Sequence, residues 1–199
     1  MKYNDFTLGQ IEAVLNKLGG IEGVMDFLSG KTIVKVPSDE KTLFNVWKTI
    51  KLGNYKNADE FRKALKKNGF KTGDWANDIL DKPAFTVAGA EEEIQLVNVS
   101  VADLGFKNGA TYKGICAKAK ELGLELCPNE VGPQLRLQYK DQPKGEHLCI
   151  AMEPITDSFG NLSIFHVGHD DDDLWLYGNR GYSVPFWDAH YRFVFRLRK

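Results

Sequence analysis

The stretch LWLYGNRGYSVPFWDAHYRFVFRLRK, residues 174–199, decides how the second half of this chain can fold. It begins and ends with runs typical of buried β-strands, at 174–178 and 193–197. Between them, residues 177–191 follow no helical or strand period and mix Tyr, Asn, Arg, Ser, Phe, Asp and His with Gly and Pro. Two regular strands thus hold one irregular, chemically varied segment, and loops held by a rigid scaffold often carry function.

The composition indicates an ordinary globular protein. The chain has 199 residues, of which 43% are hydrophobic and 27% are charged, and its net charge is −1. A charge so close to zero argues against nucleic acid or an anionic membrane as the main partner. No signal peptide opens the sequence, and no apolar run reaches the ~20 residues of a membrane helix. We therefore expect a cytoplasmic protein without a membrane partner.

The cysteines favour the same compartment. There are three, Cys116, Cys127 and Cys149, and none of them belongs to a CxxC pair. An odd number of cysteines without a signal peptide is typical of reduced thiols. We expect all three to be buried structural thiols.

The first part of the chain predicts several short helices. Thr7 can cap a helix whose apolar face includes Ile11 and Leu18, and Gly19-Gly20 ends it. A second helix is expected over 21–28, strands over 32–36 and 44–52, a strong helix capped by Asn57 or Asp59, and a short helix within 72–80. We predict a small, mostly helical N-terminal domain over residues 1–86.

The second part, residues 87–199, predicts an α+β fold. A strand is expected in 94–106, then a helix in 111–123 and a shorter one in 129–142. Short strands follow in 146–155, 162–169, 174–178 and 192–199, and 157–161 has turn chemistry. The C-terminal strand can pair with the first strand of this part.

This order resembles the C-type lectin fold, and the local sequence strengthens the likeness. The stretch ATYKGICAKAKELGLELCPNEVGPQLR, residues 110–136, is similar to the helix–loop–helix opening of the formylglycine-generating-enzyme-like branch of that fold. The closing FVFRLRK is similar to the last strand of that branch. The resemblance covers roughly residues 94–199 and implies short antiparallel strands with two helices. The matching positions of the opening are Cys116, Gly123, Leu124, Pro128 and Glu130.

Within that branch, the ending resembles the variable proteins of diversity-generating retroelements. These are binding proteins that carry a hypervariable segment just before the closing strand. Their adenine-directed mutagenesis of Asn codons cannot produce Trp, Lys, Glu, Gln or Met. Residues 154–198 contain no Lys, Glu, Gln or Met, and their only tryptophans are Trp175 and Trp187. Strand and turn segments naturally avoid Lys, Glu and Gln, so part of this deficit follows from the expected strands alone.

The resemblance implies a non-catalytic module that binds a ligand, expected to be a protein, through a diversified surface near 170–191. It needs no cofactor, and no oligomeric state is predicted. Trp175 and Trp187 would be invariant packing anchors. The displayed side chains would suit a binding surface, because Tyr offers rigid contact area and Ser and Asn offer adaptable hydrogen bonds. The displayed positions would be Tyr177, Asn179, Arg180, Tyr182, Ser183, Phe186, Asp188, Ala189, His190 and Tyr191.

The first alternative is a metal-dependent or calcium-dependent binder or hydrolase. In FHVGHDDDDLW, residues 165–175, two histidines precede four aspartates. Imidazole and carboxylate groups suit Zn, Mn or Fe, and carboxylates suit calcium. However, His166 and His169 would point to opposite faces of a strand, and Asp170–Asp173 make a plausible solvated turn. Asp171 with Asp173 is one possible calcium pair, and Asp157 with Asn161 is a second.

An enzyme could instead pair one cysteine with a histidine brought close in space. The sulfatase-activating members of the resembled branch use a cysteine pair near their C-terminal end. No cysteine follows Cys149 here, so their activity is not carried over, and GxSxG, P-loop and GxGxxG motifs are absent from the sequence. We predict a protein that is not an enzyme.

The third alternative is a nucleic-acid-associated protein acting through its N-terminal helices. The segment IEGVMDFLS, residues 21–29, would then be the recognition helix, but it carries two acidic residues and no Lys or Arg, which suits a major groove poorly. A lysine cluster in the next helical region is better explained as a solvated helix face. It comprises Lys63, Lys66, Lys67 and Lys71.

Overall fold

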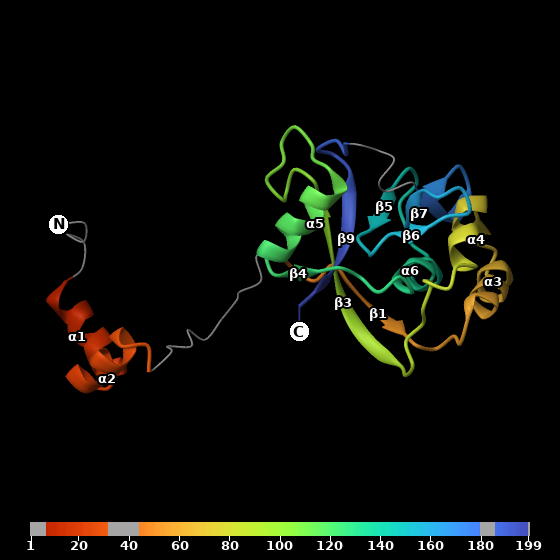
Figure 1. Ribbon diagram of the computed structural model, residues 1–199. Helices are drawn as coiled ribbons and strands as arrows, with labels where there is room; N and C mark the ends of the chain where they lie inside the picture. Colours follow the sequence, from red (N-terminus) through yellow and green to blue (C-terminus); the bar gives the residue numbers. More distant parts are fainter. Residues whose placement is uncertain (1–6, 32–43, 180–185, 199) are drawn as a thin grey trace. The chain divides into compact units, whose positions relative to one another are not determined.

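The structure, a computed structural model, describes residues 7–31, 44–179 and 186–198. The chain forms two compact units, residues 1–41 and 42–199 (Figure 1). The first unit contains α1 (Leu8–Lys17) and α2 (Gly20–Leu28). The predicted cap is confirmed, since the Thr7 hydroxyl accepts from the Gln10 backbone N–H and the Gln10 side chain accepts from the Thr7 N–H. The strand expected over 32–36 lies outside the described residues.

The second unit is built on a mixed sheet. In the described part of the chain the strands follow the order β1-β3-β9-β5-β7-β8-β2, with β4 paired to β9 and β6 to β7. Most neighbours are antiparallel, whereas β5–β9 and β2–β8 are parallel. The strands are β1 (Lys48–Leu52), β2 (Lys71–Thr72), β3 (Glu92–Ser100), β4 (Leu124–Glu125), β5 (His147–Ile150), β6 (Ile155–Thr156), β7 (Leu162–Asp170), β8 (Asp173–Asn179) and β9 (Arg192–Leu197).

Four helices accompany this sheet in the described residues. They are α3 (Ala58–Lys67), α4 (Asp74–Leu80), α5 (Tyr112–Glu121) and α6 (Val131–Gln138). Asn57 caps α3 by accepting from the Glu60 N–H at 3.0 Å, as one of the two predicted caps. Gly69, with φ of 78°, follows the helix end where the sequence predicted it. None of the described helices combines the length and the apolar composition that a membrane span requires.

The two units divide the chain at a different place from the predicted boundary near residue 86. Strand β1 pairs antiparallel with β3 along its whole length, with Ile50 opposite Ile94. The side chains of Phe61 and Leu65 on α3 belong to the same core as the sheet. Residues 44–86 therefore complete the C-terminal unit. The sequence reasoning separated them because it could recognise β1 but not its distant partner.

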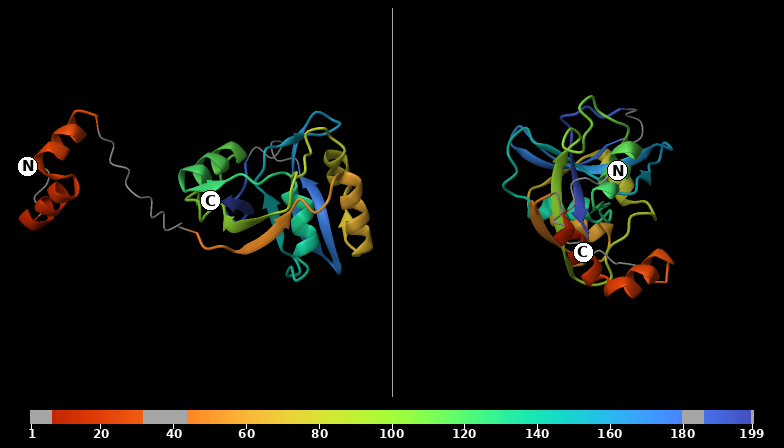
Figure 2. Two further views of the ribbon diagram at one scale, coloured as in Figure 1. Left: turned by 90° about the horizontal axis from the view of Figure 1, so that it is seen from below. Right: turned by 90° about the vertical axis from the view of Figure 1, so that its left-hand side faces the viewer.

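The expected α+β class is confirmed, and the C-terminal strand does pair with β3, with Val97 opposite Phe195. Helix α5 lies on the other side of the sheet from α3, α4 and α6 (Figures 1 and 2). Tyr112 of α5 packs near Phe193, with ring centroids 5.9 Å apart. On the opposite face Phe165 fills the space beside Gly132 of α6, where a Cβ would lie within 2.6 Å of its ring and Cβ atoms. Both faces of the central strands are therefore buried.

Candidate functional site

In residues 186–191, the described part of the segment before β9, the buried anchor is Trp187. Its side chain is fully buried, and its ring makes edge contacts with Tyr191 at 4.9 Å and Phe193 at 5.1 Å. Its backbone exchanges two hydrogen bonds with Ala110, of 2.8 and 3.0 Å. The N–H groups of Val101 and Ala102 donate to the carbonyls of Tyr191 and Ala189. The irregular segment is thus fastened to the loop that follows β3.

Around this anchor the predicted site residues differ in exposure. Phe186, Asp188, His190 and Tyr191 are exposed, and Ala189 is half-buried. Tyr177 and Asn179 are half-buried on the last residues of β8. The predicted positions Arg180, Tyr182 and Ser183 lie outside the described residues. The predicted anchor Trp187 is buried, whereas Trp175 is only half-buried and stacks on Tyr177, so it is a sheet-surface residue.

A cavity of about 480 Å³ opens beside the anchored segment. Three neighbouring strands of the sheet, β7, β5 and β9, contribute to its wall, and β8 closes it with its last residue. His190 and Tyr191 of the predicted surface line it as well. Besides Glu146, its lining residues carry three imidazoles, a guanidinium, an amide and a thiol. They belong to His147, His166, His190, Arg192, Asn179 and Cys149.

One wall of the cavity continues into a hydrogen-bonded aromatic cluster. Asp170 is its centre: one carboxylate oxygen accepts from the Tyr177 hydroxyl at 2.6 Å, and the other lies 2.9 Å from His147 Nε2. The Tyr177 ring stacks between His166 at 4.7 Å and Trp175 at 5.0 Å. Strand register causes this gathering, because His166 lies directly opposite Tyr177 and Gly168 lies between His147 and Trp175.

The cluster shifts the pKa values of its members. The hydrogen bond from Tyr177, together with His147, holds the pKa of the Asp170 carboxyl below its ordinary value. Burial, reinforced by the bond to Asp170, raises the pKa of Tyr177. At neutral pH, Asp170 is therefore a charged acceptor and Tyr177 a neutral donor. This fixes the orientation of both side chains beside the cavity.

His166 is the member with the largest shift. Burial, and then the nearby His147, lower its pKa from 6.5 to about 3, against the opposing effect of Asp170. Its Nδ1 is buried and has no hydrogen-bond partner among the described residues. A neutral imidazole is thus built into the sheet surface at neutral pH, and the folded protein resists its protonation.

This predicts that the protein loses stability in mild acid. The unfolded chain takes up a proton at residue 166 near pH 6.5, whereas the folded chain does so only near pH 3. Lowering the pH from 7 to 5 should therefore reduce the free energy of unfolding by about 2 kcal/mol through this one group. Urea unfolding followed at both pH values measures the loss. In His166→Phe the difference between the two pH values should largely disappear, and an unchanged difference would contradict the assignment to His166.

The cavity also brings together a cysteine and a histidine, since Cys149 lies directly opposite His166 on the neighbouring strand. Burial raises the pKa of the Cys149 thiol to about 12, so it is protonated at neutral pH. Burial likewise raises the pKa of Cys116 to about 11 and that of Cys127. All three cysteines are free thiols. A neutral thiol beside a neutral imidazole lacks the thiolate that nucleophilic catalysis requires.

The expected metal ligands do not converge. His166 faces the cavity, whereas His169 Nδ1 lies 2.7 Å from the Gln142 carbonyl oxygen on the other face of β7. Asp171 and Asp172 form the tight turn between β7 and β8, as the solvated-turn interpretation predicted. In the described ranges, three or more His, Cys, Asp or Glu side chains are nowhere grouped as metal ligands.

The second possible calcium pair is used within its own turn. The Asp157 carboxylate accepts from the backbone N–H groups of Phe159 and Asn161 and from the Ser163 hydroxyl. Burial raises its pKa, but these hydrogen bonds outweigh burial and leave the pKa below its ordinary value. The carboxylate therefore stabilises the turn between β6 and β7.

Sequence reasoning missed two residues of this site, His147 and Arg192. Arg192 donates through Nε to the Asn98 side chain at 3.0 Å and through a terminal nitrogen to the Asn98 carbonyl. Both residues stand at strand starts, and only strand pairing brings them to the cavity. The apolar runs in 146–150 and 192–197 indicated their strands but not the strands that pair with them.

Comparison of the chain with known proteins gives no match from which the role of the site could be inferred. The chain matches no protein-family model, no curated protein and no solved structure. The features of the molecule that bear on its function are the geometry of residues 186–191 and the cavity beside them.

Proposed function

We propose that this protein is a non-catalytic binding module that displays a diversified surface on a C-type lectin-like scaffold. The ligand, in this proposal a protein, contacts the exposed side chains of residues 186–191 and the cavity beside them. The class of diversity-generating variable proteins fits this arrangement best. The fold supports the proposal through its antiparallel β3–β9 pairing and the two helices α5 and α6, and the N-terminal part of the chain is an addition to it.

The observation that carries the proposal is the burial pattern around Trp187. One fully buried side chain alternates with exposed neighbours, Phe186 and Asp188. Backbone hydrogen bonds to Ala110 hold the segment independently of those neighbours' side chains. A surface built this way can change its chemistry without changing its backbone, which is what a diversified binding site requires.

The proposal predicts that the displayed positions tolerate substitution. Phe186→Ala, Asp188→Ala and His190→Ala should each change the free energy of unfolding by less than about 1 kcal/mol, because exposed side chains contribute little to stability. Chemical denaturation of each variant is the measurement. A loss of several kcal/mol at any of these positions would show that its side chain serves the fold and is not free to vary.

The experiment that tests the diversification is a reading of the DNA around the gene. We expect a second, near-identical copy of the end of the coding sequence, close to a reverse-transcriptase gene. Its mismatches should fall at adenines of that copy and in codons of exposed residues such as Phe186, Asp188, His190 and Tyr191. The codons of Trp187 and Trp175 should be identical in both copies. If the complete genome lacked such a copy, the proposed diversification would be wrong, and residues 186–191 would be a binding segment of fixed sequence.

A further inference from the structure

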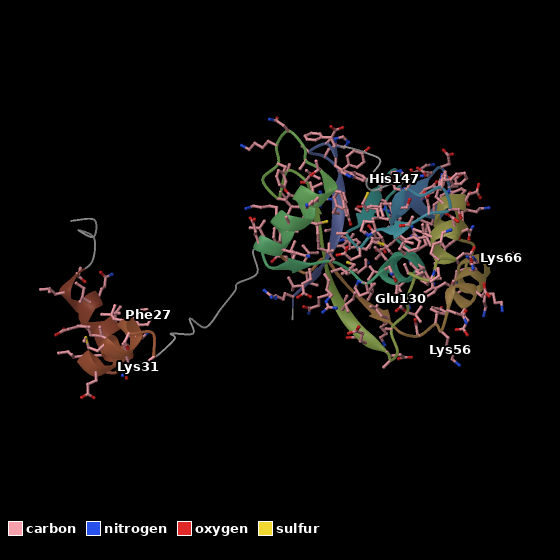
Figure 3. All side chains as sticks on the ribbon, viewed as in Figure 1. Phe27, Lys31, Lys56, Lys66, Glu130 and His147 are labelled. Carbon is pink, nitrogen blue, oxygen red and sulfur yellow. The ribbon has the colours of Figure 1, made fainter. Side chains whose placement is uncertain are left out.

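The first unit exposes an unusual number of apolar side chains. Across the described residues eleven large hydrophobic side chains are exposed, and seven of them belong to the short stretch of α1 and α2. Phe27 is labelled in Figure 3. Isolated exposed apolar residues are common, but a concentration of this kind marks an interaction surface. The seven are Leu8, Ile11, Val14, Ile21, Met25, Phe27 and Leu28.

These two helices have no core of their own. Neither α1 nor α2 contains a buried residue, although the helices are 10 and 9 residues long. Isolated helices shorter than about 12–15 residues are marginally stable in water. Units below about 40 residues usually need a disulfide, a metal or association to fold. The described part of this unit contains no cysteine and no histidine that could supply the first two. Contact with a further apolar surface is the remaining source of stability.

The shape of the helix pair is nevertheless fixed by glycines. Gly19 and Gly20 adopt φ of 88° and 78° at the turn, a region that other residues rarely occupy. A Cβ on Gly23 would lie 1.5 Å from the Leu18 carbonyl oxygen, so α2 can approach the end of α1 only with glycine at this position. The apolar face is therefore presented with a defined geometry, which suits a specific complementary surface.

The charged side chains of α1 and α2 limit which kind of partner surface the apolar face can contact. Residues 7–31 carry three acidic and two basic side chains, and Asp26 lies 3.8 Å from Lys31. An anionic membrane or a nucleic acid would require an excess of Lys and Arg, which is missing here. A nearly balanced pair meets little repulsion from a second copy of itself. The charged residues are Glu12, Lys17, Glu22, Asp26 and Lys31.

We propose that α1 and α2 dock against the α1–α2 pair of a second copy of this chain. Two copies bury their apolar faces against each other in a four-helix core with twofold symmetry, the commonest form of self-association. Each assembly then carries two copies of the binding unit, so it engages a repeated ligand more tightly than one unit does. This inference does not depend on the proposed function, because it concerns the first unit alone.

Sedimentation of the full chain at increasing concentration tests the proposal. The protein should sediment at twice its chain mass of 22.4 kDa and dissociate on dilution. Val14→Glu should weaken association at least about tenfold, because a charge at the contact must be desolvated. Asn16→Glu adds the same charge at a polar, exposed position of α1 and should change association less than about twofold. All four tryptophans lie in the second unit, so their fluorescence shows that this unit is folded in both variants.

A measurement on the unchanged chain guards against variants in which α1 and α2 unfold. Amide hydrogen exchange in residues 8–28 should slow as the protein concentration rises. A chain that is monomeric at every concentration would overturn the proposal, whether these amides are protected by the rest of the same chain or exchange freely. Association that appears only with anionic lipid vesicles would overturn it in favour of a membrane surface. Concentration-dependent protection that Val14→Glu removes and Asn16→Glu keeps would confirm it.

Discussion

Replacing Trp187 by alanine is expected to lower the free energy of unfolding by about 3–5 kcal/mol, one of the largest effects of any single change in this protein. The side chain is fully buried, and its removal leaves a cavity between Tyr191 and Phe193. The backbone bonds to Ala110 would persist only if the segment kept its path without the ring. Urea or guanidinium denaturation followed by circular dichroism measures the loss.

Phe186→Ala is the matched control, because it truncates the neighbouring aromatic residue, which is 49% exposed. We expect a change below about 1 kcal/mol for this variant. The two results together test whether the buried Trp187 holds a segment whose neighbouring side chains are exposed. If Trp187→Ala cost no more than Phe186→Ala, the segment would have no anchor and the proposed binding surface would lose its structural basis.

The features that sequence predicted well are those fixed by neighbouring residues. The Thr7 and Asn57 caps act over three positions, and the turn at Asp171 and Asp172 is determined by the two strands that flank it. Periodicity likewise placed α3 and β9 close to their true bounds. These signals are local, so one sequence is enough to read them.

The features that sequence did not predict depend on pairing between distant segments. The sequence prediction assigned β1 to a helical domain, because no pattern in residues 44–52 indicates that Ile50 pairs with Ile94. The parallel β5–β9 pairing inside an otherwise antiparallel neighbourhood has the same origin. The boundary near residue 86 followed from this missing information.

The candidate site shows the same division. The positions Phe186, Asp188, His190 and Tyr191 were expected from the resemblance, and the structure exposes their side chains. Tyr177 was predicted as a displayed residue, but its hydroxyl is committed to Asp170 and its ring to the stack with His166. The Asp/His stretch was recognised as unusual, yet its chemistry is a hydrogen-bonded sheet surface and not a group of metal ligands. The register of β7 against β8, which places His166 opposite Tyr177, determines that these side chains bond and stack with each other.

The second large effect is expected at Glu130, labelled in Figure 3, whose side chain also links the turn after β1 to the rest of the C-terminal unit. Its carboxylate is fully buried at the start of α6. One oxygen accepts from the Gly53 N–H and from the Gln134 amide, each at 2.8 Å, and the other accepts from the Ala88 N–H at 2.6 Å. One side chain thus joins the turn after β1, the segment before β3 and helix α6.

Glu130→Ala should lower the free energy of unfolding by about 3–5 kcal/mol, because one buried and two part-buried donors lose this fully buried acceptor. Glu130→Gln should cost less, since its carbonyl keeps one side of the network while its amide opposes a backbone N–H. Gln138→Ala is the control within the same helix. Its side chain bonds to Lys51 of β1 where water can replace it, and it donates one further, part-buried hydrogen bond to Gln134. We expect a change below about 1 kcal/mol there. If Glu130→Ala unfolded at the same denaturant concentration as Gln138→Ala, the carboxylate could not be what fastens β1 to the sheet unit, and the pairing of Ile50 with Ile94 would have to do so alone.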